Sequence, residues 1–378
     1  MKKSKLITSL VGGSVLLAAA PVVATSCSED TNKSSNSNYL VCGNETIKLK
    51  DNLNQADING FVTTDYTFSD GVSHKAVFVN GEYVIATKIT ELCIGSTEDV
   101  VTINYGFLAN FDHLQKLDLH GMKVFDVATL TLPNSKDSLT SFVVPTMVKQ
   151  GTAVLAIPNM FLMGFTALNK IDLTGFAEVE VIRYNFLRDC SGLKSIDLTP
   201  MTKVIEITQY FLAGCTSLTS LDFSSFKLTD TIGDHFLYGC TSLEKVDLSG
   251  FVSVNWIDTN FLEGCISLTD VDMSKMIGMT TASAELQQTG MLSGCKSLKA
   301  INVGNISTST FQGTYSEYPF CVKLTEDEWN EYDGIDLVYD DNVATGWESV
   351  ITTSGELNEI NWVDEDTYCR KWANLHKA

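Results

Sequence analysis

FLAGCTSLTSLDF at residues 211–223 is one of five similar 13-residue segments in this chain. The others are FLMGFTALNKIDL from Phe161, FLRDCSGLKSIDL from Phe186, FLYGCTSLEKVDL from Phe236 and FLEGCISLTDVDM from Phe261, so that each begins 25 residues after the last. A fixed period of this length is typical of a solenoid, because one repeat cannot bury its apolar face until a neighbour stacks on it. The sequence therefore predicts a stack of similar rungs.

The second half of each segment carries the pattern apolar-x-x-apolar-x-apolar, which alternates as a strand with one buried face does. The pattern extends beyond the five segments, and its first residues are Ile89, Leu114, Leu139, Leu168, Leu193, Leu218, Leu243, Leu268 and Leu298. We expect a β-rich α/β solenoid over residues 89–303, with about nine 25-residue rungs, a parallel sheet, and the Phe-Leu pairs in short helical or 3₁₀ turns. The longer intervals, 29 residues before Leu168 and 30 before Leu298, should form loops.

Two positions recur in register and are predicted to form structural core columns. One holds Phe161, Phe186, Phe211, Phe236 and Phe261, and the other holds Cys190, Cys215, Cys240, Cys265 and Cys295. Phe111 and Phe165 take the cysteine position in other rungs, which indicates a buried, apolar slot that a free thiol also fits. Disulfides or a metal ladder within this column are the less favoured alternatives, since stacked side chains pointing the same way have poor geometry for bridging. A Cys42–Cys93 or a Cys321–Cys369 bridge stays open.

The repeated segments resemble the BspA-like leucine-rich repeats of bacterial surface proteins, whose consensus contains F-x-G-C-x-S-L followed by a short strand. The likeness covers about residues 89–303 and is strongest in the five segments quoted above. The resemblance implies an adhesin-like, non-catalytic protein that binds host or other macromolecules.

The first 26 residues are predicted to be a lipoprotein signal peptide. Three lysines precede an apolar run, and Ala24-Thr25-Ser26-Cys27 then resembles a lipobox, which implies a lipid on the Cys27 sulfur and cleavage before it. The pattern is similar to lipoproteins of wall-less, mycoplasma-type bacteria, with the protein anchored on the extracellular face of the cell membrane; an ordinary secretory signal is the alternative. Residues 27–38 are expected to be a disordered tether.

The ends of the array are predicted to be capped. Residues 39–88 contain alternating stretches and an Asn80-Gly81 hairpin turn, so they should form an N-terminal cap. Residues 304–378 lose the repeat pattern, are acidic and contain four of the five tryptophans, so they should form a C-terminal cap.

The charge excludes one class of partner. The chain has 26 basic and 46 acidic residues, a net charge of −20, and loss of residues 1–26 removes three lysines and no acid. Nucleic acid is not expected to bind, because its phosphates require clustered Lys and Arg.

Two outward columns on the predicted strands form a candidate ligand face. They contain Lys116, Asp118, Lys170, Asp172, Asp197, Asp222, Lys245, Asp247, Asp270 and Asp272. Period-2 alternation points these side chains away from the core. The aspartates have two interpretations: they contact a partner, or they terminate each strand by accepting hydrogen bonds from nearby backbone amides.

No catalytic, cofactor-binding or metal-binding motif is found. The five histidines show no HExxH spacing, and neither a GxGxxG nor a Walker-type sequence occurs. A calcium site in the acidic C-terminal segment is a minor alternative, without EF-hand spacing. We therefore predict a binding protein and not an enzyme. A passive surface coat or spacer is the main alternative, and a transporter-associated substrate-binding lipoprotein is a less favoured one.

Overall fold

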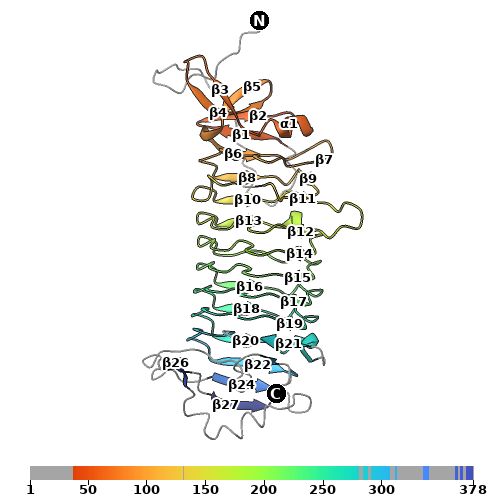
Figure 1. Ribbon diagram of the computed structural model, residues 1–378, viewed down its shortest axis with the longest axis vertical. Coiled ribbons are helices and arrows are strands. Elements are labelled where there is room, and N and C mark those ends of the chain that lie inside the picture. The colour runs from red at the N-terminus through yellow and green to blue at the C-terminus, as the bar shows by residue number, and fades with distance from the viewer. Residues whose placement is uncertain are drawn as a thin grey trace. The chain divides into compact units, whose positions relative to one another are not determined.

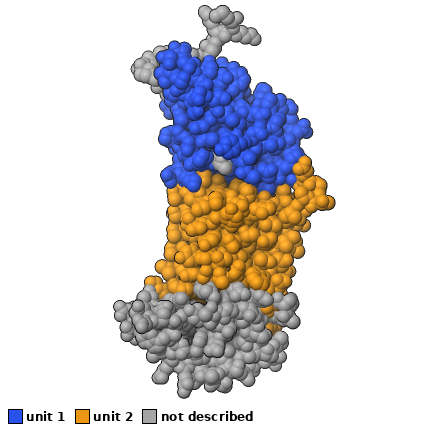
Figure 2. Space-filling view, viewed as in Figure 1, with its two compact units in different colours: residues 1–148 blue, residues 149–378 orange. Residues whose placement is uncertain are grey.

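The computed structural model describes residues 37–130, 132–280, 284–287 and 291–306, together with the strands at residues 311–312, 335–339, 362–364, 367–368 and 372–377. The chain divides into two compact units, residues 1–148 and 149–378 (Figure 2). Both contain short parallel strands stacked rung on rung, as Figure 1 shows within each unit. The predicted parallel β-solenoid with few helices is confirmed. No helix among the described residues has the length and apolar character needed to span a bilayer.

Unit 1 contains three small sheets. The first has the order β10-β8-β6-β1-β2 and comprises β1 (Tyr39–Cys42), β2 (Glu45–Lys48), β6 (Ile89–Cys93), β8 (Lys116–Asp118) and β10 (Ser141–Val143). The second is the antiparallel sheet of β3 (Thr64–Thr67), β4 (Ser73–Val79) and β5 (Glu82–Ile85). The third joins β7 (Val100–Val101), β9 (Lys123–Val124) and β11 (Thr146–Met147). Strands β6, β8 and β10 pair in parallel, whereas β1 pairs antiparallel with β6 and begins the stack.

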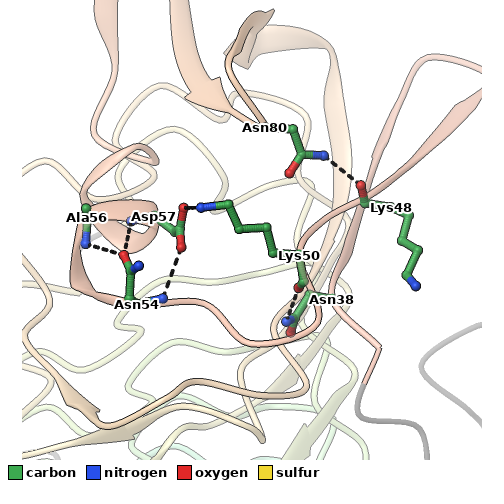
Figure 3. A network of polar contacts seen from close by, with 7 residues as sticks. All are labelled: Asn38, Lys48, Lys50, Asn54, Ala56, Asp57 and Asn80. Carbon is green, nitrogen blue, oxygen red and sulfur yellow. Dashed lines mark hydrogen bonds and ion pairs between the residues drawn. The ribbon is translucent and has the colours of Figure 1, made fainter.

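The start of unit 1 is held together by turns and side-chain caps. The expected Asn80-Gly81 hairpin turn joins β4 to β5, with φ of 52° and 85°. Helix α1 (Gln55–Asn59) begins at Asn54, whose side chain accepts from the N–H groups of Ala56 and Asp57. The buried Asn38 side chain donates to the carbonyl oxygen of Lys50 at 2.7 Å (Figure 3) and to that of Asp51 at 2.9 Å. The short 3₁₀ helix η1 (Ala86–Lys88) leads into β6.

Unit 2 has a continuous parallel sheet on the return side of each rung. Its order is β12-β14-β15-β17-β19-β21-β23, formed by β12 (Ala156–Ile157), β14 (Val181–Ile182), β15 (Glu206–Ile207), β17 (Thr231–Ile232), β19 (Trp256–Ile257), β21 (Glu285–Gln287) and β23 (Phe311–Gln312). Ile182, Ile207, Ile232 and Ile257 are completely buried along it. These isoleucines recur every 25 residues, so the repeat places them in one column, but their pairing as a second sheet was not predicted.

The predicted strands lie on the other side of unit 2, where pairing is interrupted. They are β13 (Lys170–Asp172), β16 (Ser220–Asp222), β18 (Lys245–Asp247), β20 (Asp270–Asp272) and β22 (Ala300–Gly304). The strand expected around Ile196 is wrong: residues 195–197 form no strand, and Ile196 is only half-buried. Strands β16 and β18 pair with each other, and β20 belongs to a different sheet. Where strand pairing is interrupted, the return-side sheet and the Phe-Leu turns still bond each rung to the next.

The sheet that contains β20 continues past the end of the repeat pattern. Its order is β20-β22-β24-β27, with β24 (Ile335–Tyr339) and β27 (Trp372–Lys377) both pairing in parallel. A separate antiparallel pair joins β25 (Trp362–Asp364) to β26 (Thr367–Tyr368). The solenoid sheet therefore extends into residues for which the sequence predicted only a cap. Two more 3₁₀ helices lie within rungs: η2 (Thr174–Phe176) between β13 and β14, and η3 (Ile277–Thr280) between β20 and β21.

The Phe-Leu pairs lie in turns that are neither α-helical nor 3₁₀, which corrects the prediction. Leu187, Leu212 and Leu237 have φ of 51°, 52° and 58°, in the left-handed region. Their N–H groups donate to Phe carbonyl oxygens of the preceding rung, as from Leu212 to Phe186 at 3.0 Å. A helix would direct these donors back along its own rung. Bonding between rungs therefore replaces bonding within the turn.

Candidate functional site

A hollow of about 420 Å³ lies on the strand side of unit 2, around β18 and β20. It is lined by Leu221, Glu244, Lys245, Val246, Asp247, Leu248, Ser249, Asp270, Asp272 and Lys275. The hollow occupies the place where β18 and β20 belong to different sheets. Val246, an inward residue of β18, is half-buried there, whereas the corresponding Leu221 and Val271 are buried. The interruption in pairing therefore exposes apolar surface between the charged side chains.

The charged residues around this hollow have unused bonding capacity. Glu244, Asp247, Asp270 and Asp272 supply four carboxylates, and Lys245 and Lys275 supply two ammonium groups. All six are exposed, and none of them forms an ion pair with another described residue. The local formal charge is therefore negative. An apolar floor with an acidic rim suits the aliphatic stem and the cationic end of a lysine or arginine side chain.

The structure assigns a backbone role to the aspartate column. Each Asp Oδ1 accepts a hydrogen bond from the N–H two residues later, at 2.7–3.0 Å, in Asp118, Asp172, Asp197, Asp222, Asp247 and Asp272. Asn302 makes the same bond to Gly304 at 3.1 Å. This contact is an Asx turn that ends the strand. For Asp222, hydrogen bonds from the Ser224 hydroxyl and then its N–H hold the carboxyl pKa below its ordinary value.

Only part of the predicted ligand face is brought together around the hollow. It contains Lys245, Asp247, Asp270 and Asp272, and it adds Glu244 and Lys275, which the sequence analysis missed. Glu244 directly precedes Lys245, and Lys275 follows Asp272 by three residues, so extending the search to the positions beside the outward columns would have included both. Asp222 is the strand partner of Asp247 beside the hollow but does not line it. Lys170, Asp172 and Asp197 lie elsewhere in unit 2, and Lys116 and Asp118 belong to unit 1, where Lys116 pairs with Glu91 at 3.3 Å.

One group of described residues in unit 1 brings metal-ligand atom types close together. The ligand atoms of Cys93, Asp118 and His120 lie within 4.8 Å of one another. Asp118 Oδ1 already bonds the His120 N–H at 3.0 Å and lies 2.6 Å from its Nδ1. Cys93 is disulfide-bonded. The group is therefore a closed turn and offers no thiolate to a metal.

The five cysteines in register are free and completely buried. Each thiol donates to a Leu carbonyl oxygen of the preceding rung at 3.1–3.3 Å, from Cys190 to Leu162 through Cys295 to Leu262. Burial raises the pKa of Cys240 and of Cys295 to about 12. The thiols therefore stay protonated and link neighbouring rungs.

The phenylalanine column lies beside the thiols. Phe161, Phe186, Phe211, Phe236 and Phe261 are at most 3% exposed. Successive rings stack with centroids 5.1–6.0 Å apart and interplanar angles of 7–13°.

The remaining predictions about cysteines and metals fall into two groups. Cys42 is a free, buried thiol, so the suggested Cys42–Cys93 bridge is not formed. Cys27, the Cys321–Cys369 pair and the acidic stretch considered for calcium lie outside the described residues or their described side chains.

Comparison with known proteins identifies the repeats. Residues 155–284 match the family model described as "BspA type Leucine rich repeat region", in six copies. No curated protein matches the sequence. Similar solved structures include a leucine-rich repeat protein from Bacteroides ovatus, with 15% identity, a TM-score of 0.23, and coverage of 74% of this chain and 97% of that one. Another is an internalin from Listeria monocytogenes, with 14% identity, a TM-score of 0.18, and coverage of 79% and 90%. The repeats at residues 155–284 are thus similar to BspA-type leucine-rich repeats.

Proposed function

We propose that this chain is a lipid-anchored protein on the extracellular face of the cell membrane, and that it binds host or other extracellular proteins without catalysis. The lipid on Cys27 attaches it to the membrane, and the acidic hollow of unit 2 contacts the partner. The sequence before Cys27 supports the anchor, and the leucine-rich repeat architecture supports protein binding.

The observation that carries the binding proposal is the hollow around β18 and β20. Its floor exposes apolar atoms, and its rim has four carboxylates, none of which forms an ion pair with a described basic residue. Pockets that bury an apolar group inside a polar rim are typical of the centre of a protein interface. A passive spacer needs no such hollow. The function that this geometry supports best is therefore binding of a partner protein through one of its basic side chains.

A double variant tests the hollow without disturbing the Asx turns. Glu244→Gln with Asp270→Asn removes two carboxylates whose oxygens accept no backbone N–H among the described contacts, unlike those of Asp247 and Asp272. Parent and variant, as residues 27–378, are used to capture proteins from host-cell extract, and the affinity of each captured protein is then measured. We expect a partner bound by the parent to bind the variant at least about tenfold more weakly, with a smaller salt dependence.

Glu206→Gln is the matched control, since it removes one carboxylate from the outward side of β15. It should leave the affinity unchanged. If a partner binds the double variant as tightly as the parent, then the hollow is not its site. Absence of any saturable partner would favour the passive spacer.

A further inference from the structure

The antiparallel sheet of β3, β4 and β5 in unit 1 has an aromatic outer face. Tyr66 and Tyr83 stack across the sheet with centroids 3.9 Å apart and an interplanar angle of 17°. Phe68 meets Tyr66 edge-on at 4.9 Å, and Phe78 meets Tyr83 at 5.0 Å. Ala76, the small residue of β4 on this face, is completely buried. The four rings form one contiguous cluster, which we call the aromatic face.

This cluster is not the core of the sheet. The core lies on the opposite face, where Val77 is 0% and Val84 is 4% exposed. On the aromatic face, Phe78 is 48% exposed, and Val72, in the turn before β4, is 47% exposed. A solvated face of an antiparallel sheet is normally polar. Tyr66, Phe68 and Tyr83 are half-buried, so together with Phe78 they present a contiguous, partly exposed apolar surface. Single exposed apolar residues are ordinary, but a contiguous apolar surface of this kind marks a contact site.

The chemistry of the aromatic face favours lipid over a charged macromolecule. Its four rings and Val72 include no Lys, Arg, Asp or Glu side chain. His74 lies on this face opposite Tyr66, and its ring meets Phe68 edge-on at 5.9 Å, whereas Lys75 lies on the other face and is paired with Asp65 at 3.0 Å. Nucleic acid or a strongly charged protein would find no cluster of complementary charges here. Tyrosine and phenylalanine are suited to the bilayer interface, where apolar rings meet the acyl chains and hydroxyl groups stay among the headgroups.

The position of the aromatic face in the chain brings it within reach of a membrane. Described residues begin at residue 37, ten residues after Cys27. Ten residues span at most about 36 Å when extended and about 17–19 Å as a flexible coil. The β3–β5 sheet is attached close to this start, because Asn80 at its hairpin turn donates to the Lys48 carbonyl oxygen of β2 at 2.7 Å. A lipid on Cys27 would therefore hold this sheet beside the bilayer.

We propose that the aromatic face of β3–β5 rests on the bilayer interface and orients unit 1 on the membrane. This inference rests on the proposed lipid anchor for its geometry. The diacyl lipid supplies the attachment. The aromatic face supplies a preferred contact with the lipid.

Tryptophans introduced one at a time can report this contact. Val72→Trp and Phe78→Trp place the probe in the aromatic face, and Tyr105→Trp is the control, because Tyr105 is 86% exposed in the same unit. Each protein is attached to vesicles of brominated phosphatidylcholine, and quenching of the added fluorescence is taken relative to the parent with its five tryptophans. We expect the V72W and F78W signals to be quenched at least about twofold more than that of Y105W.

Attaching the protein to the vesicles in two different ways tests the membrane contact of the aromatic face separately from the proposed lipid anchor. In one, the protein carries its native lipid, verified by mass. In the other, residues 27–378 with Cys27→Ser are held on nickel-chelating lipid by an N-terminal hexahistidine. Stronger quenching at positions 72 and 78 with the hexahistidine supports membrane contact even if the native chain is found unlipidated, which would overturn only the anchor. Equal quenching of all three probes in every mode that attaches the protein overturns the proposal and leaves the aromatic face to a protein partner.

Discussion

At the scale of single residues, the buried thiols make a prediction about reactivity. Cys215, Cys240 and Cys265 are 0% exposed, and each S–H bonds a carbonyl oxygen. Since the thiolate is the reactive form, we expect no maleimide labelling of these residues in the native protein and full labelling after unfolding. Mass spectrometry of peptides after timed labelling measures this. Rapid native labelling would contradict the buried column.

The same thiols predict how stability depends on pH. Burial raises the pKa of Cys240 and Cys295 from 9.0 to about 12, so the folded state keeps protons that the unfolded state loses. The free energy of unfolding should therefore fall as pH rises from about 9 to about 12, by up to about 1.4 kcal/mol per pH unit for each thiol. Urea unfolding at several pH values tests this. Replacing both residues with alanine should make the dependence shallower, although Cys215 and Cys265, whose pKa values burial also raises, still contribute. An unchanged slope would exclude Cys240 and Cys295 as its cause.

The aspartate column predicts different effects for asparagine and alanine. Asp222 Oδ1 accepts the Ser224 N–H at 2.7 Å, and Asn302 makes the equivalent bond to Gly304 naturally. Asp222→Asn should therefore leave stability nearly unchanged, whereas Asp222→Ala should cost about 1 kcal/mol by removing the acceptor. Denaturant midpoints compare the two variants. Equal loss in both would mean that the charge, and not the Asx turn, is what stabilises the rung.

At the scale of structural elements, the stacked phenylalanines should carry more stability than the thiols beside them. Phe236 is 0% exposed and stacks on Phe211 and Phe261 at 5.5 and 5.1 Å. Phe236→Ala should cost about 3–5 kcal/mol, and Cys240→Ala in the same rung only about 1 kcal/mol, because fewer buried atoms are lost. Chemical denaturation measures both. A thiol variant as damaging as the phenylalanine variant would reverse this ranking.

The close approach of successive rungs makes one glycine much less replaceable than another. A Cβ on Gly250 would lie 2.0 Å from the Phe223 carbonyl oxygen, whereas a Cβ on Gly239 meets nothing within 4 Å although its φ is +68°. Gly250→Ala must displace backbone and should cost about 3 kcal/mol or more, against about 1 kcal/mol for Gly239→Ala. Thermal unfolding of the two variants decides the order. Similar losses would show that rung spacing adapts easily.

At the scale of the whole molecule, the proposed attachment to the membrane depends on one sulfur. The acidic chain gains no attraction from anionic headgroups, so the lipid on Cys27 must provide the proposed anchoring. Cys27→Ser should move the protein from the detergent phase to the aqueous phase in Triton X-114. Cys42→Ser, which changes a free buried thiol after the predicted signal peptide, is the control and should remain in the detergent phase. Detergent partitioning of the Cys27 variant like that of the parent would refute the lipobox.

The amino-acid sequence by itself determined the period, the strand positions in most rungs and the membership of the Phe and Cys columns. These follow from local repetition, since a residue that recurs every 25 positions must meet its own copy in the next rung. Only the tertiary structure decided which rungs pair. The unpaired segment at residues 195–197, the hollow at β18 and β20, and the aromatic face of β3–β5 depend on distances between segments that the repeat pattern does not encode. The role of the aspartate column was also open in the sequence, because a carboxylate at that position can contact a partner or accept a hydrogen bond within a turn. The observed bond from a backbone N–H assigns one carboxylate oxygen to the turn.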